Sequence, residues 1–305
     1  MIAPGWLWIP ITLGASVAQT ARNAAQRHLT PALGTLGATL VRFIYGLPFA
    51  VLWLAVVRLS SNETMPTPNA TFLVWVAVSS LAQIAATALL LRVMAERNFA
   101  LGVAYAKTEV IQIAAFGLLF LGDPLTAATV AAVILGTAGV MLLSPIDRDR
   151  PLRTLLSGWT TRSAMLGMAS GAGFAIAAVG YRGGALALGD RPFLIASAYS
   201  LVAAQALQTV MLGGWLAARN AAVVMRVLRA WRRSLFAGFM GAAASACWFA
   251  AFVLEPAAHV RTLGLVEIFF SYAVSRHFFR EAVTRAEVAG MALLAIAVVL
   301  ISVAR

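Results

Sequence analysis

The stretch EVIQIAAFGLLFLGD, residues 109–123, is matched 158 residues later by EIFFSYAVSRHFFRE, residues 267–281. Each stretch opens on a glutamate, Glu109 or Glu267, continues through apolar residues and closes on an acid. Apolar sequences align easily by chance, so the matching acids carry the correspondence and not the alanines and leucines. The match predicts an internal repeat that extends outward from these two segments.

The chain as a whole is rich in apolar residues. Of its 305 residues, 61% are hydrophobic and 11% are charged, against roughly 45–50% and about 25% in soluble domains. About 20 apolar residues cross a hydrocarbon core, and such spans are predicted at 6–26, 32–57, 72–94, 100–121, 125–144, 164–181, 192–217, 235–254, 262–279 and 286–304. We therefore predict an all-α protein with ten transmembrane helices, multi-pass in the cell's inner (plasma) membrane.

The most polar connection divides the predicted spans into two equal sets. A first five-helix repeat covers 1–144, a polar linker covers 145–162, and a second five-helix repeat covers 163–305. Two copies of a five-span unit must lie in opposite orientations, and positive charge supports this. The connection after the second span carries only Arg58, whereas its counterpart after the seventh carries five arginines: Arg219, Arg226, Arg229, Arg232 and Arg233. Inverted repeats of this kind bind ligands near the membrane midplane.

Charge and cysteine content exclude several classes of partner. The net charge is +12, but most arginines lie between apolar spans, where they set topology and contact lipid headgroups, so no nucleic-acid partner is expected. The arginines of 219–233 are spaced as in a short amphipathic helix on a membrane surface, or in a solvated extension of the seventh span. The single cysteine, Cys247, excludes an intrachain disulfide and a cysteine metal site, and no cofactor or metal is predicted.

Three features resemble one transporter family. An arginine, Arg42, lies a short way into the second span, a glutamate opens each of the two matched stretches, and an acid follows each about fourteen residues later. This pattern resembles the drug/metabolite transporter superfamily, of the ten-helix EamA-domain type, over nearly the whole chain. In the family a proline usually follows each glutamate, whereas Val110 and Ile268 follow them here. The family also usually has Gly-Glu at the tight turn, where this chain has Gly122-Asp123.

The resemblance implies a secondary transporter and not an enzyme. The family exports amino acids, drugs and other metabolites, or exchanges small solutes, by proton coupling or by exchange. The expected partners are a small-molecule substrate and the lipid bilayer, and the expected state is a monomer or homodimer. Charge places both termini outside the cytoplasm, whereas members of the family usually have both termini inside.

Ionisable residues within the spans are the strongest candidates for function. Glu109 and Glu267, expected near the midplane, are a possible proton-coupling pair, because a carboxyl group in a low dielectric can exchange protons near neutral pH. Each is equally well explained as a structural contact between helices. Arg42 is interpreted as a ligand for an anionic group or, with more weight, as an ion-pair partner of one glutamate. Lys107 is expected to point away from Glu109, and Arg22 to reach the membrane interface.

Other polar and aromatic residues complete the candidate site. Gln19, Arg22, Asn23 and Gln26 form one stripe of the first span, which predicts either the wall of a wet cavity or a helix contact. Gln83 in the third span is a further polar candidate. The aromatic candidates, for which ordinary packing is the alternative, are Tyr105, Trp248 and Tyr272.

Two other functions stay open. A membrane-embedded enzyme acting on lipid-linked substrates needs clustered catalytic groups, but His28, His259 and His277 are far apart and expected in separate loops, and no nucleophile or metal motif is present. A non-transporting membrane partner subunit is the other alternative.

Overall fold

The computed structural model describes residues 4–61, 63–96, 103, 106, 107, 109–124, 126–143 and 162–279, with parts of 289–300. The described part is helical and contains no strand, which confirms the all-α prediction for those residues. Tyr105, the acid predicted to close the second matched stretch (Glu281), and all of the linker except Arg162 lie outside the described residues.

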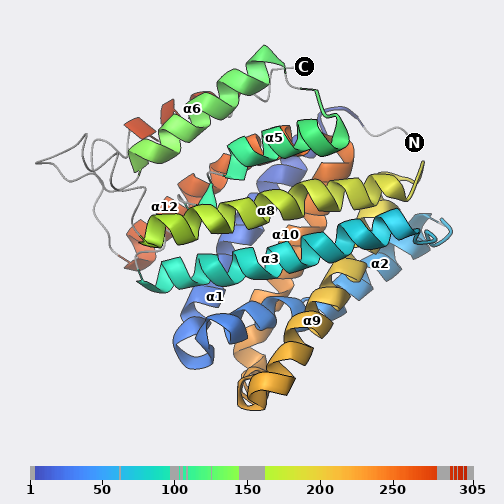
Figure 1. The fold of residues 1–305 in the computed structure, drawn as a ribbon, viewed down its shortest axis with the longest axis vertical. Coiled ribbons are helices and arrows are strands. Elements are labelled where there is room, and N and C mark those ends of the chain that lie inside the picture. Colours follow the sequence, from blue (N-terminus) through green and yellow to red (C-terminus); the bar gives the residue numbers. More distant parts are fainter. Residues whose placement is uncertain are drawn as a thin grey trace, which may run out of the picture.

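The helices form an elongated bundle (Figure 1). In chain order they are α1 (Trp8–Ile44), α2 (Leu47–Ser61), α3 (Ala70–Glu96), α5 (Glu109–Leu121), α6 (Ala127–Leu143), α8 (Arg162–Ala187), α9 (Phe193–Arg229), α10 (Trp231–Leu254), α11 (Ala257–Leu263), the 3-10 turn η1 (Gly264–Val266) and α12 (Glu267–Phe279).

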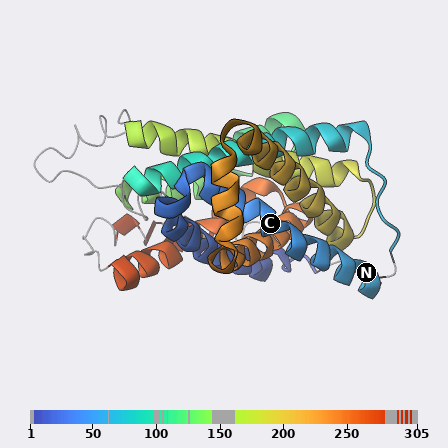
Figure 2. The same ribbon diagram turned by 90° about the horizontal axis from the view of Figure 1, so that it is seen from below.

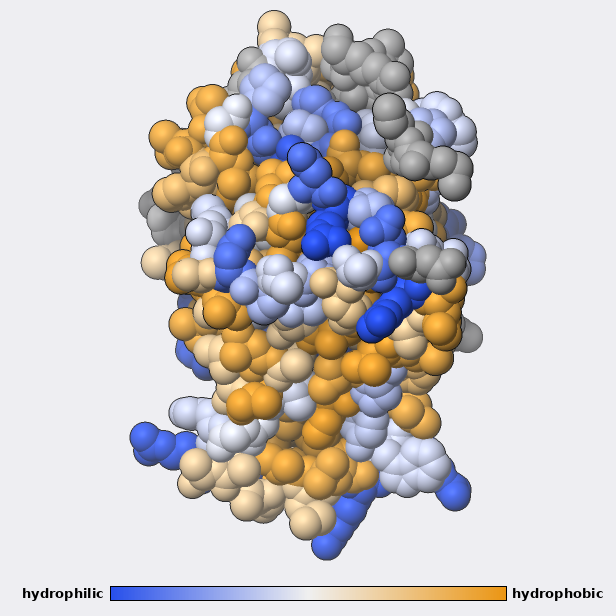
Figure 3. Space-filling view, turned by 90° about the vertical axis from the view of Figure 1, so that its right-hand side faces the viewer, coloured by the Kyte–Doolittle hydropathy of each residue, from blue (hydrophilic) through white to orange (hydrophobic). Residues whose placement is uncertain are grey.

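Five of these helical segments are long and apolar enough to cross a membrane: Trp8–Ser61, Ala70–Glu96, Arg162–Ala187, Phe193–Arg229 and Trp231–Leu254. Large apolar side chains face outward on them and on α5, as at Leu59, Leu119 and Val210, which are 81%, 73% and 70% exposed. Hydrophobic surface covers much of the face in Figure 3, with hydrophilic side chains gathered in its upper part and at its lower end. Such a surface is suited to lipid and not to water.

The α1 helix contains a break at Gly34. Its φ of 73° and ψ of 168° are accessible almost only to glycine. Gln26 spans the break, because its Nε2 donates a hydrogen bond of 2.7 Å to the carbonyl oxygen of Ala38. The first predicted span therefore runs directly into the first part of the second, without an intervening loop.

The long helices pack in pairs. The most extensive contacts join α1 to α10 and α3 to α8, and α9 packs on α1 and α2; the α3–α8 pair is visible in Figures 1 and 2. Small residues permit this closeness. A Cβ placed on Gly173 would lie 2.9 Å from the Cβ of Ala86, and one on Gly238 would lie 2.5 Å from that of Tyr45. Close approach through small residues is typical of helices in membranes.

Both matched glutamates begin a helix. Glu109 is the first residue of α5, and Glu267 is the first residue of α12, directly after the 3-10 turn. The predicted spans 100–121 and 262–279 are therefore not single continuous helices, because a turn at Lys107 precedes α5 and the 3-10 turn η1 precedes α12. The first turn of a helix has unpaired N–H groups and a positive dipole end, so an acid is favoured there.

The arginine-rich segment also lies behind a break. Asn220, with φ of −156° and ψ of 71°, interrupts α9, and the helix resumes as far as Arg229. The resumed part packs inward, since a Cβ on Gly37 would lie 3.2 Å from Val223 and 3.5 Å from Val227. A short helix is thus present at 221–229, and its contact with a membrane surface stays a prediction.

Candidate functional site

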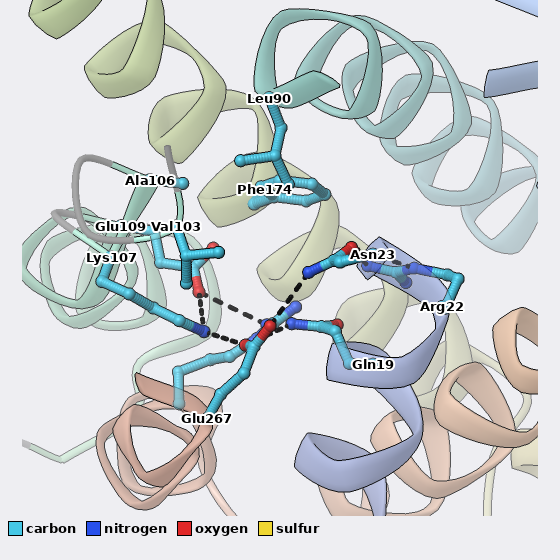
Figure 4. Close-up of a pocket in the computed structure, with 11 residues that line it drawn as sticks. Gln19, Arg22, Asn23, Leu90, Val103, Ala106, Lys107, Glu109, Phe174 and Glu267 are labelled. Atoms are coloured by element: carbon cyan, nitrogen blue, oxygen red, sulfur yellow. Dashed lines mark hydrogen bonds and ion pairs between the residues drawn. The ribbon is translucent and has the colours of Figure 1, made fainter. Parts of the chain in front are cut away.

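Residues far apart in the sequence meet in a buried ionic cluster (Figure 4). The Nζ of Lys107 lies 2.5 Å from the Oε2 of Glu267 and 3.7 Å from the Oε1 of Glu109. All three side chains are at least 95% buried. Glu109 and Glu267, which open the two matched stretches of the sequence, therefore both lie within 4 Å of the Lys107 ammonium group.

The α1 helix supplies two further donors to Glu267. The Nε2 of Gln19 donates to Oε2 at 2.6 Å, and the Nδ2 of Asn23 donates to Oε1 at 3.0 Å. Gln19 is itself oriented by Trp248 on α10, whose Nε1 donates to the Gln19 Oε1 at 2.9 Å. A carboxylate from the second half of the chain is thus held by amides from the first half.

Glu109 has a partner of its own. The Nη1 of Arg261, on α11, lies 3.3 Å from its Oε1. The Arg261 guanidinium also stacks over the rings of Trp248, 4.3 Å from the centroid, and Phe252, 5.4 Å from the centroid. Aromatic faces attract a cation electrostatically, so these contacts fix the guanidinium beside the carboxylate.

Arg22 and Arg42 are also buried, at 1% and 2% exposure. Arg22 donates to the Oδ1 of Asn23 at 2.6 and 3.2 Å, and Arg42 donates to the hydroxyl groups of Thr87 (3.2 Å) and Ser245 (3.3 Å). Neither has an ion pair with a carboxylate in the described part of the chain. The expected Arg42–glutamate pair is therefore wrong, because Lys107 and Arg261 occupy the carboxylates.

The charges in this region do not balance. Four buried cations, Arg22, Arg42, Lys107 and Arg261, face the two carboxylates Glu109 and Glu267, so the cluster with every group ionised has a charge of +2. Burying a charge without a partner is costly. A buried cluster whose charges do not balance is therefore the candidate functional site.

Two small cavities adjoin the cluster. The first leaves about 20 Å³ open to a water-sized sphere, and its lining includes Gln19, Arg22, Asn23, Lys107, Glu109, Phe174, Arg261 and Glu267. The second leaves about 10 Å³, and its lining includes Gln19, Arg42, Gln83, Phe174, Tyr181, Ser245, Trp248 and Arg261. Roughly 10–15 Å³ suffices for one water molecule. This conformation is therefore closed to any larger solute.

The residues of the predicted polar stripe on α1 make two kinds of contact. Gln19, Arg22 and Asn23 line the first cavity, whereas Gln26 bridges the break in its own helix. Gln83 belongs to a second polar group, in which it accepts hydrogen bonds from Tyr181 (3.1 Å) and Gln208 (2.6 Å).

Of the aromatic candidates, Trp248 lines the second cavity. Tyr272 lies on α12, where it is partly exposed and is not among the residues lining either cavity.

No sequence pattern singled out Lys107 or Arg261 as a site residue, and Arg22 was expected both on the polar stripe and at the membrane interface. Lys107 precedes α5 in a turn, so helix-face geometry does not keep it from Glu109, and Arg22 is buried instead of reaching the interface. A usable signal was present, because each is a cation in or next to a predicted apolar span, and Lys107 is the one lysine of the chain.

Other polar contacts lie outside the cluster. Asp123 follows the tight turn at Gly122 and pairs with Arg182 at 3.2 Å. The three histidines lie on helices and not in loops, and His259 contacts Glu255 (2.7 Å) and Thr129 (2.8 Å). Within the described residues no group of three or more metal-ligating side chains is present.

A large apolar groove is separate from the ionic cluster. It is a groove of about 580 Å³ lined almost wholly by apolar side chains of α2, α9 and α10, among them Trp53, Leu201 and Phe239. With no charged residue in its lining, it offers no charged group to bind a polar solute, and it is not the candidate site.

Comparison with known proteins reveals similarity of fold. No protein-family model and no curated protein matches the sequence. Twenty-four chains of solved structures match. One, described only as a crystal structure of a protein, has a TM-score of 0.65 to this chain and 14% sequence identity, covering 96% of this chain and 94% of its own. The likeness extends over nearly the whole of both chains, and it shows a shared fold.

Proposed function

We propose that the chain is a secondary transporter, an exporter of small metabolites such as amino acids or amphipathic drugs in the inner membrane, and not an enzyme. The observation that carries the proposal is the buried cluster around Lys107, Glu109 and Glu267, which adjoins a cavity with room for water inside an otherwise apolar bundle. Ionisable groups at such depth mark solute and ion pathways.

The packing supports ten spans arranged as inverted repeats. In this arrangement the first part of α1 is the first span, α3 the third, α8 the sixth and α10 the eighth. Two-fold pseudosymmetry relates the first span to the sixth and the third to the eighth. It therefore makes the α1–α10 contact equivalent to the α3–α8 contact. These are the two most extensive helix contacts in the described part of the chain. Two similar interfaces allow one half to rock against the other, as in alternating access.

The cluster also offers a coupling step. Lys107 bridges one carboxylate that begins α5 and another that begins α12. A proton or a charged substrate that entered the cavity would change which of these groups pair. Because the paired groups come from different helices, the change would favour one packing of the helices over the other.

Flux into proteoliposomes tests the proposal. Purified protein should drive counter-substrate-dependent or pH-gradient-dependent uptake of at least one metabolite from a panel of amino acids and their analogues. Glu267→Gln should fold but lose the dependence on the pH gradient, whereas Glu96→Gln, which changes a partly exposed pair at the end of α3, should behave as wild type. If Glu109→Gln and Glu267→Gln both leave flux and its pH dependence unchanged, the carboxylates have no coupling role.

A further inference from the structure

Arg42 is the buried cation with the least compensation. Its side chain is 2% exposed, and its hydrogen-bond partners among the described residues are two neutral hydroxyl groups, those of Thr87 and Ser245. The Nε–H has no hydrogen-bond partner among the described residues. In contrast, Lys107 and Arg261 each contact a carboxylate, and Arg22 is linked to Glu267 through Asn23.

A second guanidinium lies close to Arg42 and adds to the positive charge. A Cβ placed on Gly241 of α10 would lie 3.2 Å from the Cγ of Arg42 and 3.4 Å from the Cδ of Arg22. The two arginines therefore pack against the same glycine. The Arg42 guanidinium also lies 5.5 Å from the centroid of the Phe43 ring, but the neighbouring charge is another cation and not an acid.

The second cavity gives Arg42 an apolar surrounding. Arg42, Ser245 and Gln83 are among its polar lining residues, and aromatic side chains form much of the remaining wall: Phe174, Tyr181, Trp248, Phe249 and Phe252. The unpaired Nε–H and the adjacent terminal N–H groups of a guanidinium form an edge that fits both oxygens of a carboxylate. The Ser245 and Thr87 hydroxyl groups can rotate to donate as well.

We propose that Arg42 binds the carboxylate of a small monoanionic solute whose apolar or aromatic body contacts the wall formed by Phe174, Trp248 and Phe252. The inference rests on the proposed transport function for its access route, because the cavity admits only about 10 Å³ in this closed conformation. Among the described buried arginines, Arg261 contacts a carboxylate directly and Arg22 is linked to one through Asn23. Only Arg42 is left without an acid, so a solute with a single negative charge is expected.

Ligand-dependent melting of the protein in lipid nanodiscs tests this with matched probes. Phenylacetate, benzoate and hexanoate are each compared with the corresponding neutral amide, and inorganic phosphate is included as a second oxyanion. At least one carboxylate should raise the melting temperature while its amide does not. The carboxylate concentration that gives half of the maximal rise in melting temperature should be at least about tenfold higher for Arg42→Gln than for wild type, because a charge-assisted hydrogen bond is lost. Arg42→Lys should be intermediate.

Two controls separate binding from folding. Arg92→Gln removes an arginine of α3 whose side chain is 49% exposed, and it should respond to carboxylate as wild type does. Without ligand, Arg42→Gln should melt no lower than wild type, because a buried charge without an acid partner has been removed. Should Arg42→Gln fail to fold, Ser245→Ala retains the charge, and weakened carboxylate binding is expected there too.

The inference is wrong if each carboxylate acts no more strongly than its amide, if phosphate alone stabilises the protein, or if Arg42→Gln responds as wild type does. These results are distinct from failure of the proposed function. Carboxylate binding without flux in proteoliposomes would contradict the transport proposal but support carboxylate binding by Arg42. Flux confined to uncharged or cationic solutes would support transport but contradict carboxylate binding by Arg42.

Discussion

The ammonium group of Lys107 lies 2.5 Å from the carboxylate of Glu267, although 160 residues separate them in the chain. The chain contains 22 arginines and this single lysine. The single lysine of the chain therefore lies between Glu109 and Glu267, the glutamates that open the two matched stretches.

Removal of Lys107 should destabilise the protein strongly. In Lys107→Met the carboxylate of Glu267 loses its closest cation while remaining buried, and breaking a buried pair in this way costs about 3–5 kcal/mol. Unfolding in a mixed-micelle denaturant series measures the change. Arg92→Met, which removes a surface pair with Glu96, should cost less than about 1 kcal/mol. Equal stability of Lys107→Met and wild type would show that the cluster is not held by this pair.

Trp248→Phe should distinguish the contribution of the Trp248 hydrogen bond to stability from that of its ring contacts. The substitution removes the Nε1–H that orients Gln19 but keeps an aromatic face beneath Arg261. We expect a loss of about 1–3 kcal/mol, since a buried acceptor is left unsatisfied and the side chain becomes smaller. Trp215→Phe, at a side chain that is 51% exposed, is the matched control and should change the melting temperature little. A similar effect of both substitutions would contradict the proposed orienting role.

Gly34→Ala should show that the break in α1 depends on backbone conformation. A Cβ at Gly34 meets no atom within 4 Å, and the same is true at Gly14 in the same helix. The two positions differ in backbone angles, because only Gly34 has a positive φ. Gly34→Ala should therefore cost about 1–3 kcal/mol, whereas Gly14→Ala should be neutral or add up to about 1 kcal/mol through helix propensity. Equal melting temperatures for the two variants would contradict the break.

Glu267→Gln combined with Lys107→Met tests whether the pair acts as a unit. Without the carboxylate, removal of the lysine leaves one fewer unpaired buried charge, so the double variant should be more stable than the sum of the single effects predicts. For groups in contact the coupling energy is about 0.5–3 kcal/mol. It is read from the four melting or denaturant curves of the cycle. Additive effects within about 0.5 kcal/mol would mean that the two groups do not interact.

The apolar spans and the paired glutamates could be predicted because each depends on a local signal. Runs of about 20 apolar residues define membrane helices by length, and an acid within such a run is rare enough to be noticed. The spacing of Gln19, Arg22 and Asn23 also predicted a common face, and all three line one cavity.

The helix breaks and the ion pairs could not be predicted in the same way. Glu109 and Glu267, the first residues of α5 and α12, contact Arg261, Gln19 and Asn23 from distant parts of the chain, which a local pattern does not contain. The expected pair of Arg42 with a glutamate is wrong for the same reason. The choice among several buried cations depends on three-dimensional distances, and here Lys107 and Arg261 lie closer to the acids.

The central claim is that the cluster faces water during a transport cycle, and cysteine accessibility measures this most directly. In a Cys247→Ala background, Asn23→Cys is placed beside Glu267, and Leu119→Cys is placed on the outer surface of α5, where the native side chain is 73% exposed. A membrane-impermeant, charged thiol reagent should label Asn23→Cys from at least one side of the membrane and leave Leu119→Cys largely unlabelled. Labelling of Leu119→Cys alone, with Asn23→Cys inert from both sides yet reactive after denaturation, would contradict the account.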